Sequence, residues 1–323
     1  MSSFTKQYEF CQLWIRYTCT CLYQSSRWPV LASVNCLNSL CRACSTNTPL
    51  FCGLIGDNLK VTRQFLENYR PSYLYLHISC GVVFYNLTSG KDIALNKKPL
   101  VFGIGQCSLD YIGRIPVYPP PDVKCEFSNL VVQGGGPVAT ALVALKRWGV
   151  DGCIAGVTGD DDFGAQISSS LMTEGIDTGG LFIRQNQHSQ FAFIVSEPAT
   201  ARRTIFWQRP NGQPLQPEEL DLNLLLKCSA LHTDGLFPEA SLIACRKAKE
   251  AGIPVIVDAG TLRDGMLEIA KFSDCFVTSE TFSNALSATP EETCRILAGL
   301  GVRFTGVTLG AKGYIALIDG RLG

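Results

Sequence analysis

Long apolar runs, an excess of one charge and a regular cysteine pattern are all missing from this chain of 323 residues. The longest nearly apolar runs are far shorter than the roughly 18–20 residues that a membrane-spanning helix needs. Lysine plus arginine number 28 and aspartate plus glutamate also number 28, so the charge does not favour a nucleic acid or an acidic membrane as partner. We therefore expect a soluble protein that binds neither.

Acidic residues are scarce at the start of the chain. Glu9 is the only one before Asp57, whereas basic residues are spread among many serines and threonines. This composition fits an organellar transit peptide, and the pattern of a secretory signal is not present. We expect a cytoplasmic protein, with a plastid or mitochondrion as the alternative if residues 1–56 act as a transit peptide.

The region 1–96 as a whole is a cysteine-rich extension to which we assign no function, and an error in the gene model is the alternative to a transit peptide. It holds eight of the 15 cysteines, including a lone Cys41-x-x-Cys44 without the second ligand pair of a zinc site or the strand–helix context of a redox pair. The stretch 73–85 predicts one or two buried strands. The seven later cysteines lie in apolar strings and are expected to be buried thiols.

From about residue 100 the pattern becomes regular, with short apolar strands separated by helices of about 10–15 residues. Such alternation predicts right-handed βαβ units and a mainly parallel sheet, with ligands bound outside the carboxyl ends of the strands. The predicted strands lie at 101–105, 153–157, 255–257, 275–277 and 305–309 and before 231, and the predicted helices at 138–148, 161–172, 238–250 and 290–300.

Two stretches interrupt this alternation. The stretch 112–132 is extended and rich in proline, and residues 191–195 and 203–207 flank a short connection that predicts a β-hairpin. Together they predict a small antiparallel sheet, within about 112–132 and 190–209, that covers the strand ends as a lid. Without further information, such a hairpin is more often plain scaffold.

Two motifs near the first predicted strand carry candidate ligand-binding groups. Asp110 follows that strand and is placed to accept hydrogen bonds from two hydroxyls of a ligand, the alternative being a helix or turn cap. Gly134 and Gly135 precede the first long helix, whose N-terminus offers backbone N–H groups to a hydroxyl or an anion, the alternative being a tight structural turn. A third motif, Gly159-Asp160-Asp161-Asp162-Phe163-Gly164, is expected to be structural, because acids at a helix start are explained by the helix dipole.

The run Val307 to Gly313, Val-Thr-Leu-Gly-Ala-Lys-Gly, places a hydroxyl and bare backbone at a strand end. This run resembles the nucleotide-site strand of the ribokinase-like (PfkB) carbohydrate kinases. The order and spacing of the four motifs extend the resemblance over roughly residues 97–323. It implies a three-layer αβα fold with a mainly parallel sheet plus a small β-sheet lid.

The resemblance also implies the chemistry, which is ATP-dependent phosphorylation of a hydroxymethyl group on a sugar or a sugar-like substrate. Asp110, Gly134 and Gly135 would hold the sugar, and Thr308, Gly310 and Gly313 would lie along the nucleotide. ATP and Mg²⁺ are the implied cofactors, although no residue is predicted to bind the metal. The lid sheet has edge strands that would pair with a second copy, which makes a homodimer one hypothesis.

In this family a Gly-Ala-Gly-Asp helix start follows the nucleotide strand and supplies the catalytic base, and the given sequence ends at Gly323. We therefore expect an incomplete kinase domain that is inactive or impaired, because the substrate hydroxyl lacks its proton acceptor. The alternatives are a non-catalytic sugar- or nucleotide-binding regulatory module and a structural pseudoenzyme. His188 and His232 are the candidate replacement bases in this region, and neither is assigned catalysis.

Overall fold

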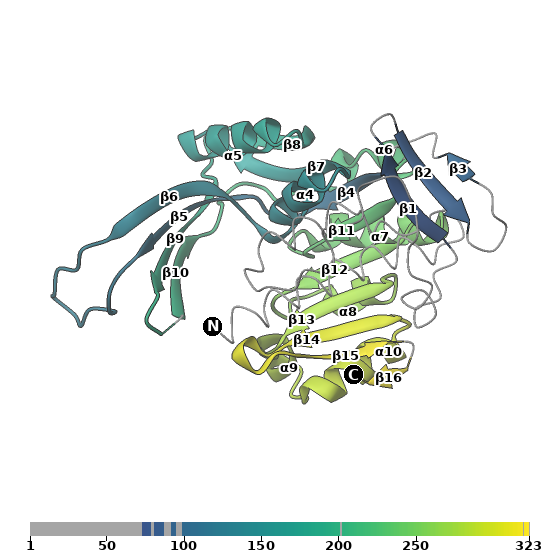
Figure 1. The fold of residues 1–323 in the computed structure, drawn as a ribbon. Helices are drawn as coiled ribbons and strands as arrows, with labels where there is room; N and C mark the ends of the chain where they lie inside the picture. Colours follow the sequence, from purple (N-terminus) through teal and green to yellow (C-terminus); the bar gives the residue numbers. More distant parts are fainter. Residues whose placement is uncertain are drawn as a thin grey trace, which may run out of the picture. The chain divides into compact units, whose positions relative to one another are not determined.

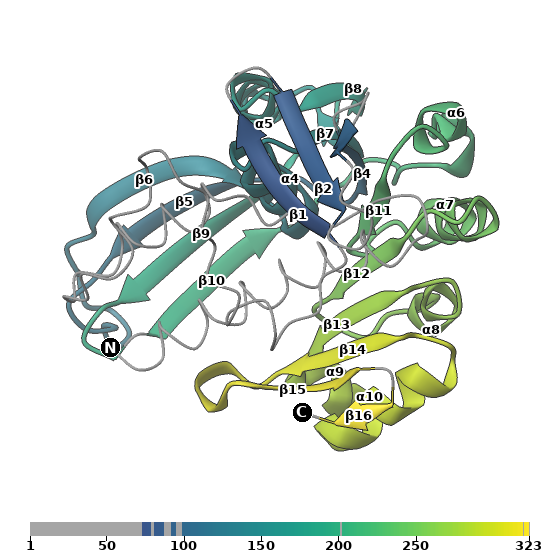
Figure 2. The same ribbon diagram turned by 45° about the vertical axis from the view of Figure 1, so that its right-hand side comes forward.

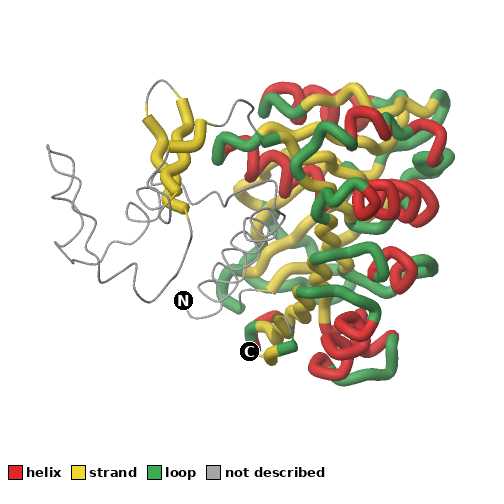
Figure 3. Tube along the Cα trace, turned by 90° about the vertical axis from the view of Figure 1, so that its right-hand side faces the viewer, coloured by secondary structure: helices red, strands yellow, loops and turns green. Residues whose placement is uncertain are grey.

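The computed structural model describes residues 73–78, 81–86, 92–94, 99–200, 202–318 and 320–322. The chain divides into two compact units. In the smaller one, β1 (Tyr73–Ile78), β2 (Gly81–Asn86) and β3 (Asp92–Ala94) form a three-stranded antiparallel sheet (Figure 3). The strand prediction for 73–85 is therefore confirmed as two strands. The expectations for residues 1–56, including Cys41 and Cys44, lie outside the described residues.

A nine-stranded sheet forms the centre of the larger unit (Figure 1). Its order is β16-β15-β14-β13-β12-β11-β4-β7-β8, and the seven strands from β14 to β8 pair in parallel. The strands are β4 (Leu100–Ile104), β7 (Asp151–Gly159), β8 (Asp177–Arg184), β11 (Ala230–Thr233), β12 (Val255–Ala259), β13 (Cys275–Ser279), β14 (Phe304–Thr308), β15 (Tyr314–Ile318) and β16 (Arg321–Leu322).

Helices connect these strands and cover both faces of the sheet. The chain runs from β4 to β7 and β8 in one direction and from β11 to β14 in the other, so right-handed crossovers place their helices on opposite faces. Figure 2 shows α4 on one side and α7 and α8 on the other. The helices are α4 (Pro137–Arg147), α5 (Asp162–Thr173), α6 (Leu222–Leu225), α7 (Pro238–Glu250), α8 (Met266–Ala270), α9 (Glu280–Ala285) and α10 (Pro290–Gly299), with short 3₁₀ turns η1 (Pro217–Glu219) and η2 (Gly310–Lys312).

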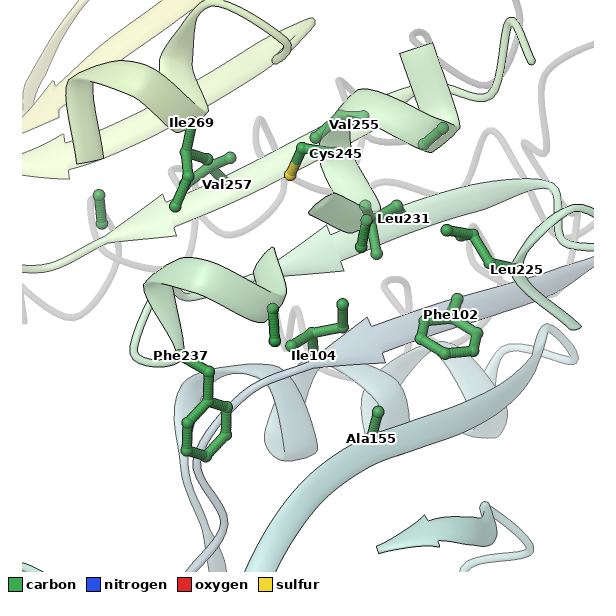
Figure 4. Packing of buried hydrophobic residues seen from close by; sticks show 14 of the residues in the cluster. Phe102, Ile104, Ala155, Leu225, Leu231, Phe237, Cys245, Val255, Val257 and Ile269 are labelled. Carbon is green, nitrogen blue, oxygen red and sulfur yellow. The ribbon is translucent and has the colours of Figure 1, made fainter. Parts of the chain in front are cut away.

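The main apolar core lies between the sheet and α7 and α8 (Figure 4). Phe102 and Ile104 of β4, Leu231 of β11 and Val257 of β12 contribute large side chains from the sheet. The helix side contributes small residues, as at Cys245, and small residues let α7 lie close to the strands. The core therefore holds the carboxyl ends of neighbouring strands in fixed relative positions.

A second, small sheet belongs to the same unit and has the order β10-β9-β5-β6. It consists of β5 (Ser108–Arg114), β6 (Ser128–Gly135), β9 (Gln190–Glu197) and β10 (Arg202–Gln208). The β5–β6 and β9–β10 pairs are antiparallel hairpins, and β5 and β9 join them in parallel. The predicted small sheet is thus present, but it begins at Ser108, and it is mixed rather than wholly antiparallel because β5 and β9 are parallel.

Aromatic side chains attach one face of the small sheet to α5. The ring of Phe163 lies 6.1 Å from that of Tyr111 and 5.1 Å from that of Phe191, and Phe193 stacks on Phe127 at 5.0 Å. Pairs at these distances add to the energy of burying the rings. The small sheet is therefore fastened to the main domain at its base.

Most of the sequence expectations for this unit hold. The predicted strands and helices all form, and Gly149 ends α4 with a positive φ of 89°. Strand β8 and the antiparallel hairpin of β14 with β15 were not predicted. None of the seven described cysteines forms a disulfide, and all except Cys125 are buried. In the part of the chain that the structure describes, no helix is both long and apolar enough to cross a membrane.

Replacing Phe276 with alanine should lower the free energy of unfolding by about 3–5 kcal/mol, because a cavity of this kind is not refilled. Phe276 of β13 is fully buried and meets the ring of Phe282 edge-on at 5.8 Å. Chemical denaturation of the full chain measures the change. Ile296→Ala on α10, where the side chain is 42% exposed, is the control and should change stability far less. Equal losses in the two variants would contradict this account of the core.

Candidate active site

Asp110 lies within β5, and its carboxylate accepts a hydrogen bond from Ser108 Oγ at 2.8 Å. The predicted alternative for Asp110, a helix or turn cap, is wrong, since the residue lies in a strand and caps no helix. Burial raises the pKa of the Asp110 carboxyl above its usual value, and the Ser108 hydrogen bond lowers it in part. The side chain is a half-buried acceptor at the base of the small sheet.

Gly134 and Gly135 end β6, and Gly136 is the N-cap of α4. The alternative for Gly134 and Gly135, a tight structural turn, is wrong: both residues pair with β5, and the turn is made at Gly136. A Cβ on Gly135 would overlap the Asp110 carboxylate, and a Cβ on Gly136 would overlap the carbonyl oxygen of Gln106. The predicted sugar-binding residues Asp110 and Gly135 are thus in direct contact, beside the start of α4.

The start of α4 has no side chain that caps it, and Pro137 occupies the first turn. The exposed N–H groups of a helix start and its dipole favour an oxygen-rich ligand. On the small sheet, Asp110 stands in register with Ala192 of β9 and, across it, with Trp207 of β10. Residues in register share a face, so Asp110, Ala192 and Trp207 lie in a row on one face of the small sheet. The small Ala192 stands between the Asp110 carboxylate and the exposed Trp207 ring.

Two further acids lie at the same edge of the main sheet. Asp234 follows β11 and accepts hydrogen bonds from the N–H groups of Gln106 at 3.0 Å and Leu236 at 2.9 Å. Burial raises the pKa of Asp234 to about 7, and burial raises that of Asp258, in β12, to about 6. Arg263 lies close enough to act on Asp234, and burial lowers the pKa of its guanidinium.

Neither Asp234 nor Asp258 is among the site residues predicted from the sequence. The signal was nonetheless present, because each acid lies at the carboxyl end of a buried parallel strand, where ligands of such sheets bind. His232, one residue before the end of β11, is fully buried, and its Nδ1 lies 3.2 Å from the carbonyl oxygen of Ile256. Burial lowers the pKa of His232 to about 4, so it is a neutral part of the scaffold.

The motif 159–164 is structural, as expected. Asp161 caps α5 by accepting a hydrogen bond from the N–H of Gly164 at 2.9 Å, and it also accepts from the hydroxyl of Ser189 at 2.6 Å. Burial alone would raise the pKa of Asp161, but these hydrogen bonds hold it below its usual value. The motif therefore connects α5 to the start of β9.

Thr308 ends β14, and Gly310 and Gly313 follow it, at the carboxyl edge of the main sheet. The hydroxyl of Thr308 donates to the carbonyl oxygen of Thr278 at 3.1 Å. Gly310 and Gly313 have φ values of 58° and 94°, and a Cβ on either would meet no atom within 4 Å. Glycine is required there by the backbone conformation, and a flat ligand can approach the bare main chain. Lys312, between them, lies 3.5 Å from Glu280.

With this geometry established, comparison with known proteins shows the class. The family model "pfkB family carbohydrate kinase" matches residues 98–322, which is more than half of the chain. This chain belongs to that family. Its larger unit has the ribokinase-like α/β fold, with a large, mainly parallel sheet and a smaller separate sheet.

Named relatives are sugar kinases. The chain is 27% identical over 252 residues to Fructokinase-2 of Oryza sativa subsp. japonica, which covers 70% of this chain and 73% of that protein. Probable fructokinase-3 of Arabidopsis thaliana is 27% identical over 169 residues, or 51% of this chain and 47% of that protein. The chain thus spans about half the length of several curated relatives that it matches.

Solved structures show the same fold. A putative ribokinase from Agrobacterium tumefaciens superposes with a TM-score of 0.61 at 23% identity, covering 70% of this chain and 76% of that chain. The Arabidopsis thaliana ribokinase complexed with ribose and ATP gives a TM-score of 0.57 at 19% identity, covering 70% and 76%. At these identities the likeness establishes the fold.

Gly135→Ala should displace the Asp110 carboxylate and break its hydrogen bond with Ser108, since the new methyl group would occupy the same space. Overpacking of this kind costs about 1–3 kcal/mol. A crystal structure and a thermal unfolding curve measure the two effects. Gly299→Ala in α10 is the control: a Cβ there meets nothing within 4 Å, so its stability should stay the same or rise. An unmoved Asp110 in the Gly135 variant would refute the contact.

Proposed function

We propose that this chain carries the sugar site and part of the nucleotide site of an enzyme that transfers the γ-phosphoryl group of ATP to a hydroxymethyl group of a sugar or sugar-like compound. One observation carries the proposal: in a member of the pfkB family, the Asp110 carboxylate lies against Gly135 at the start of α4. A fold alone does not define a function, and this contact supplies the local chemistry that supports one.

On the sugar side, ionised Asp110 would accept hydrogen bonds from two hydroxyls, with Ser108 fixing the carboxylate in one orientation. Backbone N–H groups of Gly135 and of the α4 start would donate to the same substrate. Held in this way, the sugar presents its reacting hydroxyl in a single orientation, and such positioning is the main contribution of a kinase to phosphoryl transfer.

On the nucleotide side, the main chain at Gly310 and Gly313 is open enough for a flat base or ribose to lie against it, with Thr308 beside it. These residues fit ATP. ATP, when bound, supplies the phosphoryl group. Mg²⁺ is usually held by few carboxylates and by the substrate phosphates, so we propose it with ATP and assign it no protein ligand.

The small sheet would act as the lid of this site. Its Asp110 face carries Trp207 and Ile205, which are half-exposed apolar side chains in register with neighbouring strands. An apolar sheet over the strand ends would exclude water, and that limits hydrolysis of ATP without a sugar acceptor.

Binding of the same ligands without turnover is the second candidate function. The observation in its favour is that His232 is buried with a pKa of about 4, and His188 is an exposed residue whose backbone N–H is held by Asn211. Neither is placed as a proton acceptor for a sugar hydroxyl. An assay of ADP release with a panel of sugars separates the two functions: sugar-dependent release supports transfer, and ligand binding without release supports the second candidate.

Asp110→Ala should abolish the rise in melting temperature that a sugar causes, while the rise caused by ATP stays within error of the parent. A ligand raises the melting temperature only if it binds the folded state, so the loss reports the sugar contact. Because burial raises the pKa of Asp110, sugar binding by the parent should weaken as pH falls through that raised pKa. Glu250→Ala, an exposed acid at the end of α7, is the control. A sugar response in Asp110→Ala equal to the parent's would rule out the assigned role.

We also propose that the small sheet forms a homodimer. Its edge strands β6 and β10 expose runs of large apolar residues: Leu130, Val131 and Val132 on β6, and Ile205, Phe206 and Trp207 on β10. Unpaired strand edges of this kind readily add another strand. A second copy would cover both the apolar side chains and the open backbone groups.

Phe206→Asp should convert the dimer to a monomer in sedimentation experiments, because the charge would be buried in the interface. Phe206 is 51% exposed and stands in register with Phe193, on the face opposite Asp110, so the sugar response should persist. Ile296→Asp, with 42% exposure on α10, is the control. Identical sedimentation of the parent and Phe206→Asp would show that this edge is not the interface.

A further inference from the structure

Four passages of chain join the small sheet to the main sheet. They run from β4 to β5, from β6 to α4, from β8 to β9, and from β10 to η1 (Figure 1). Because Asp110 lies on the small sheet, these passages decide where its carboxylate stands relative to the strand ends of the main sheet. Each passage is held by a different contact.

The first two passages are packed against each other. Gly136 leaves no room for a Cβ beside the carbonyl oxygen of Gln106, and the N–H of Gln106 donates to the buried Asp234 at 3.0 Å. The third passage is held at Ser189. Its N–H and its hydroxyl donate to the two oxygens of Asp161 at 2.9 and 2.6 Å, and the same hydroxyl accepts from the N–H of Gly159 at 2.9 Å.

The fourth passage, residues 209–216, is held by Arg184, the last residue of β8. Its guanidinium forms two parallel hydrogen bonds of 2.7 Å with the carboxylate of Glu219. It also donates to the carbonyl oxygens of Gln213 at 2.9 Å and Pro214 at 3.2 Å. One side chain thus holds the second half of the segment that returns from β10 and the 3₁₀ turn that follows it.

Several features make this contact stronger than an ordinary surface ion pair. The two side chains are only 17% and 22% exposed. The Arg184 hydrogen bond holds the pKa of Glu219 below its usual value, and Glu219 raises that of Arg184. Forked arginine–carboxylate pairs are geometrically specific, which suits them to hold an angle rather than only to add stability.

Arg184 also ties the third passage to the fourth. A Cβ on Gly212 would come within 3.0 Å of Arg184 Cγ, so the returning chain lies against the arginine stem. The N–H of His188, in the third passage, donates to the Asn211 side chain in the fourth at 2.6 Å. Strands β9 and β10 therefore leave the main domain through a single cross-linked base, which is centred on the end of β8.

We propose that Arg184 and Glu219 are positioning residues that set the angle of the small sheet, and through it the place of Asp110 above the strand ends. A sugar then binds to a sheet that is already in position, which spares the cost of ordering it. The inference rests on the proposed function for what Asp110 binds, but not for the angle of the sheet. Arg184 touches neither Asp110 nor residues 308–313, so any effect of Arg184 on sugar binding passes through the small sheet.

The test compares Arg184→Gln and Glu219→Gln with a matched pair elsewhere in the chain. Arg147 and Glu174 also form a two-bond arginine–carboxylate contact, through Nε and Nη2 and at a more exposed place, between the end of α4 and the end of α5. Arg147→Gln and Glu174→Gln are therefore the controls. Arg184→Lys keeps the charge but loses the fork and should rescue only in part. Glu219→Gln serves if Arg184→Gln fails to fold.

Hydrogen–deuterium exchange of the full chain without ligand measures how firmly the Arg184–Glu219 contact holds the base of the small sheet. Breaking the Arg184–Glu219 contact should speed exchange in peptides that span residues 190–216 at least about tenfold, because local opening becomes easier. Exchange in α10 and β14 should stay unchanged. The controls should alter neither set. Unchanged exchange at 190–216, or equal acceleration over the whole chain, would overturn the proposal.

Calorimetry of sugar binding measures the consequence for the position of Asp110. Loss of positioning should raise the dissociation constant for the sugar at least about tenfold, with ATP affinity unchanged. The double variant Arg184→Gln/Glu219→Gln should lose no more than either single one, as for two residues acting as a unit. Sugar affinity equal to that of the Arg147→Gln control would refute the positioning role. If the parent binds no sugar, the proposed function fails. The exchange experiment still tests whether Arg184 and Glu219 hold the small sheet.

Discussion

The absence of side chains at Gly134, Gly135 and Gly136 is the constraint on which the site depends. A Cβ at the first would lie 2.8 Å from Ser170 Oγ, at the second it would overlap Asp110, and at the third it would overlap the Gln106 carbonyl oxygen. Three consecutive bare residues thus let β6 approach α5, let the Asp110 carboxylate stand at the start of α4, and let the first two passages pack together. The candidate sugar site, the start of α4 and the attachment of the small sheet follow from this one close approach.

Buried charge at the strand ends is the electrostatic counterpart of this packing. Asp234 is taken out of water, which raises its pKa to about 7, yet it is held by two backbone N–H donors, one of which belongs to the passage into β5. An acid that is costly to bury is retained where it orients a loop. The cost of burying Asp234 is therefore offset where the carboxylate orients the passage into β5. Asp161 at the base of β9 orients a loop without that cost, because its hydrogen bonds hold its pKa below the usual value.

The main sheet could be predicted from sequence because buried parallel strands form continuous apolar runs and helices repeat every 3.6 residues. Asp110 and Gly135 could be predicted to lie near each other from their motifs. Their direct contact could not, since it depends on the register that pairs Ser108 with Gly135. Strand β8 escaped prediction because Asp177-Thr178-Gly179-Gly180 begins it with turn-forming residues. The Arg184–Glu219 contact joins residues 35 positions apart, and charge patterns in a single sequence do not reveal such pairs.

The small sheet combines a rigid base with an exposed outer part. Near the main domain, Phe163 and the Arg184 contact hold it by rings and by a forked ion pair, whereas Ile205 and Phe206 on β10 are largely open to solvent. Rings and ion pairs resist tilting in different ways: the rings need only stay in contact, but the fork is lost on a small rotation. Apolar contact with α5 therefore keeps the sheet attached. The angle of the sheet depends on the Arg184–Glu219 ion pair, and the position of Asp110 depends on that angle. A site that must hold a hydroxyl in one orientation needs both.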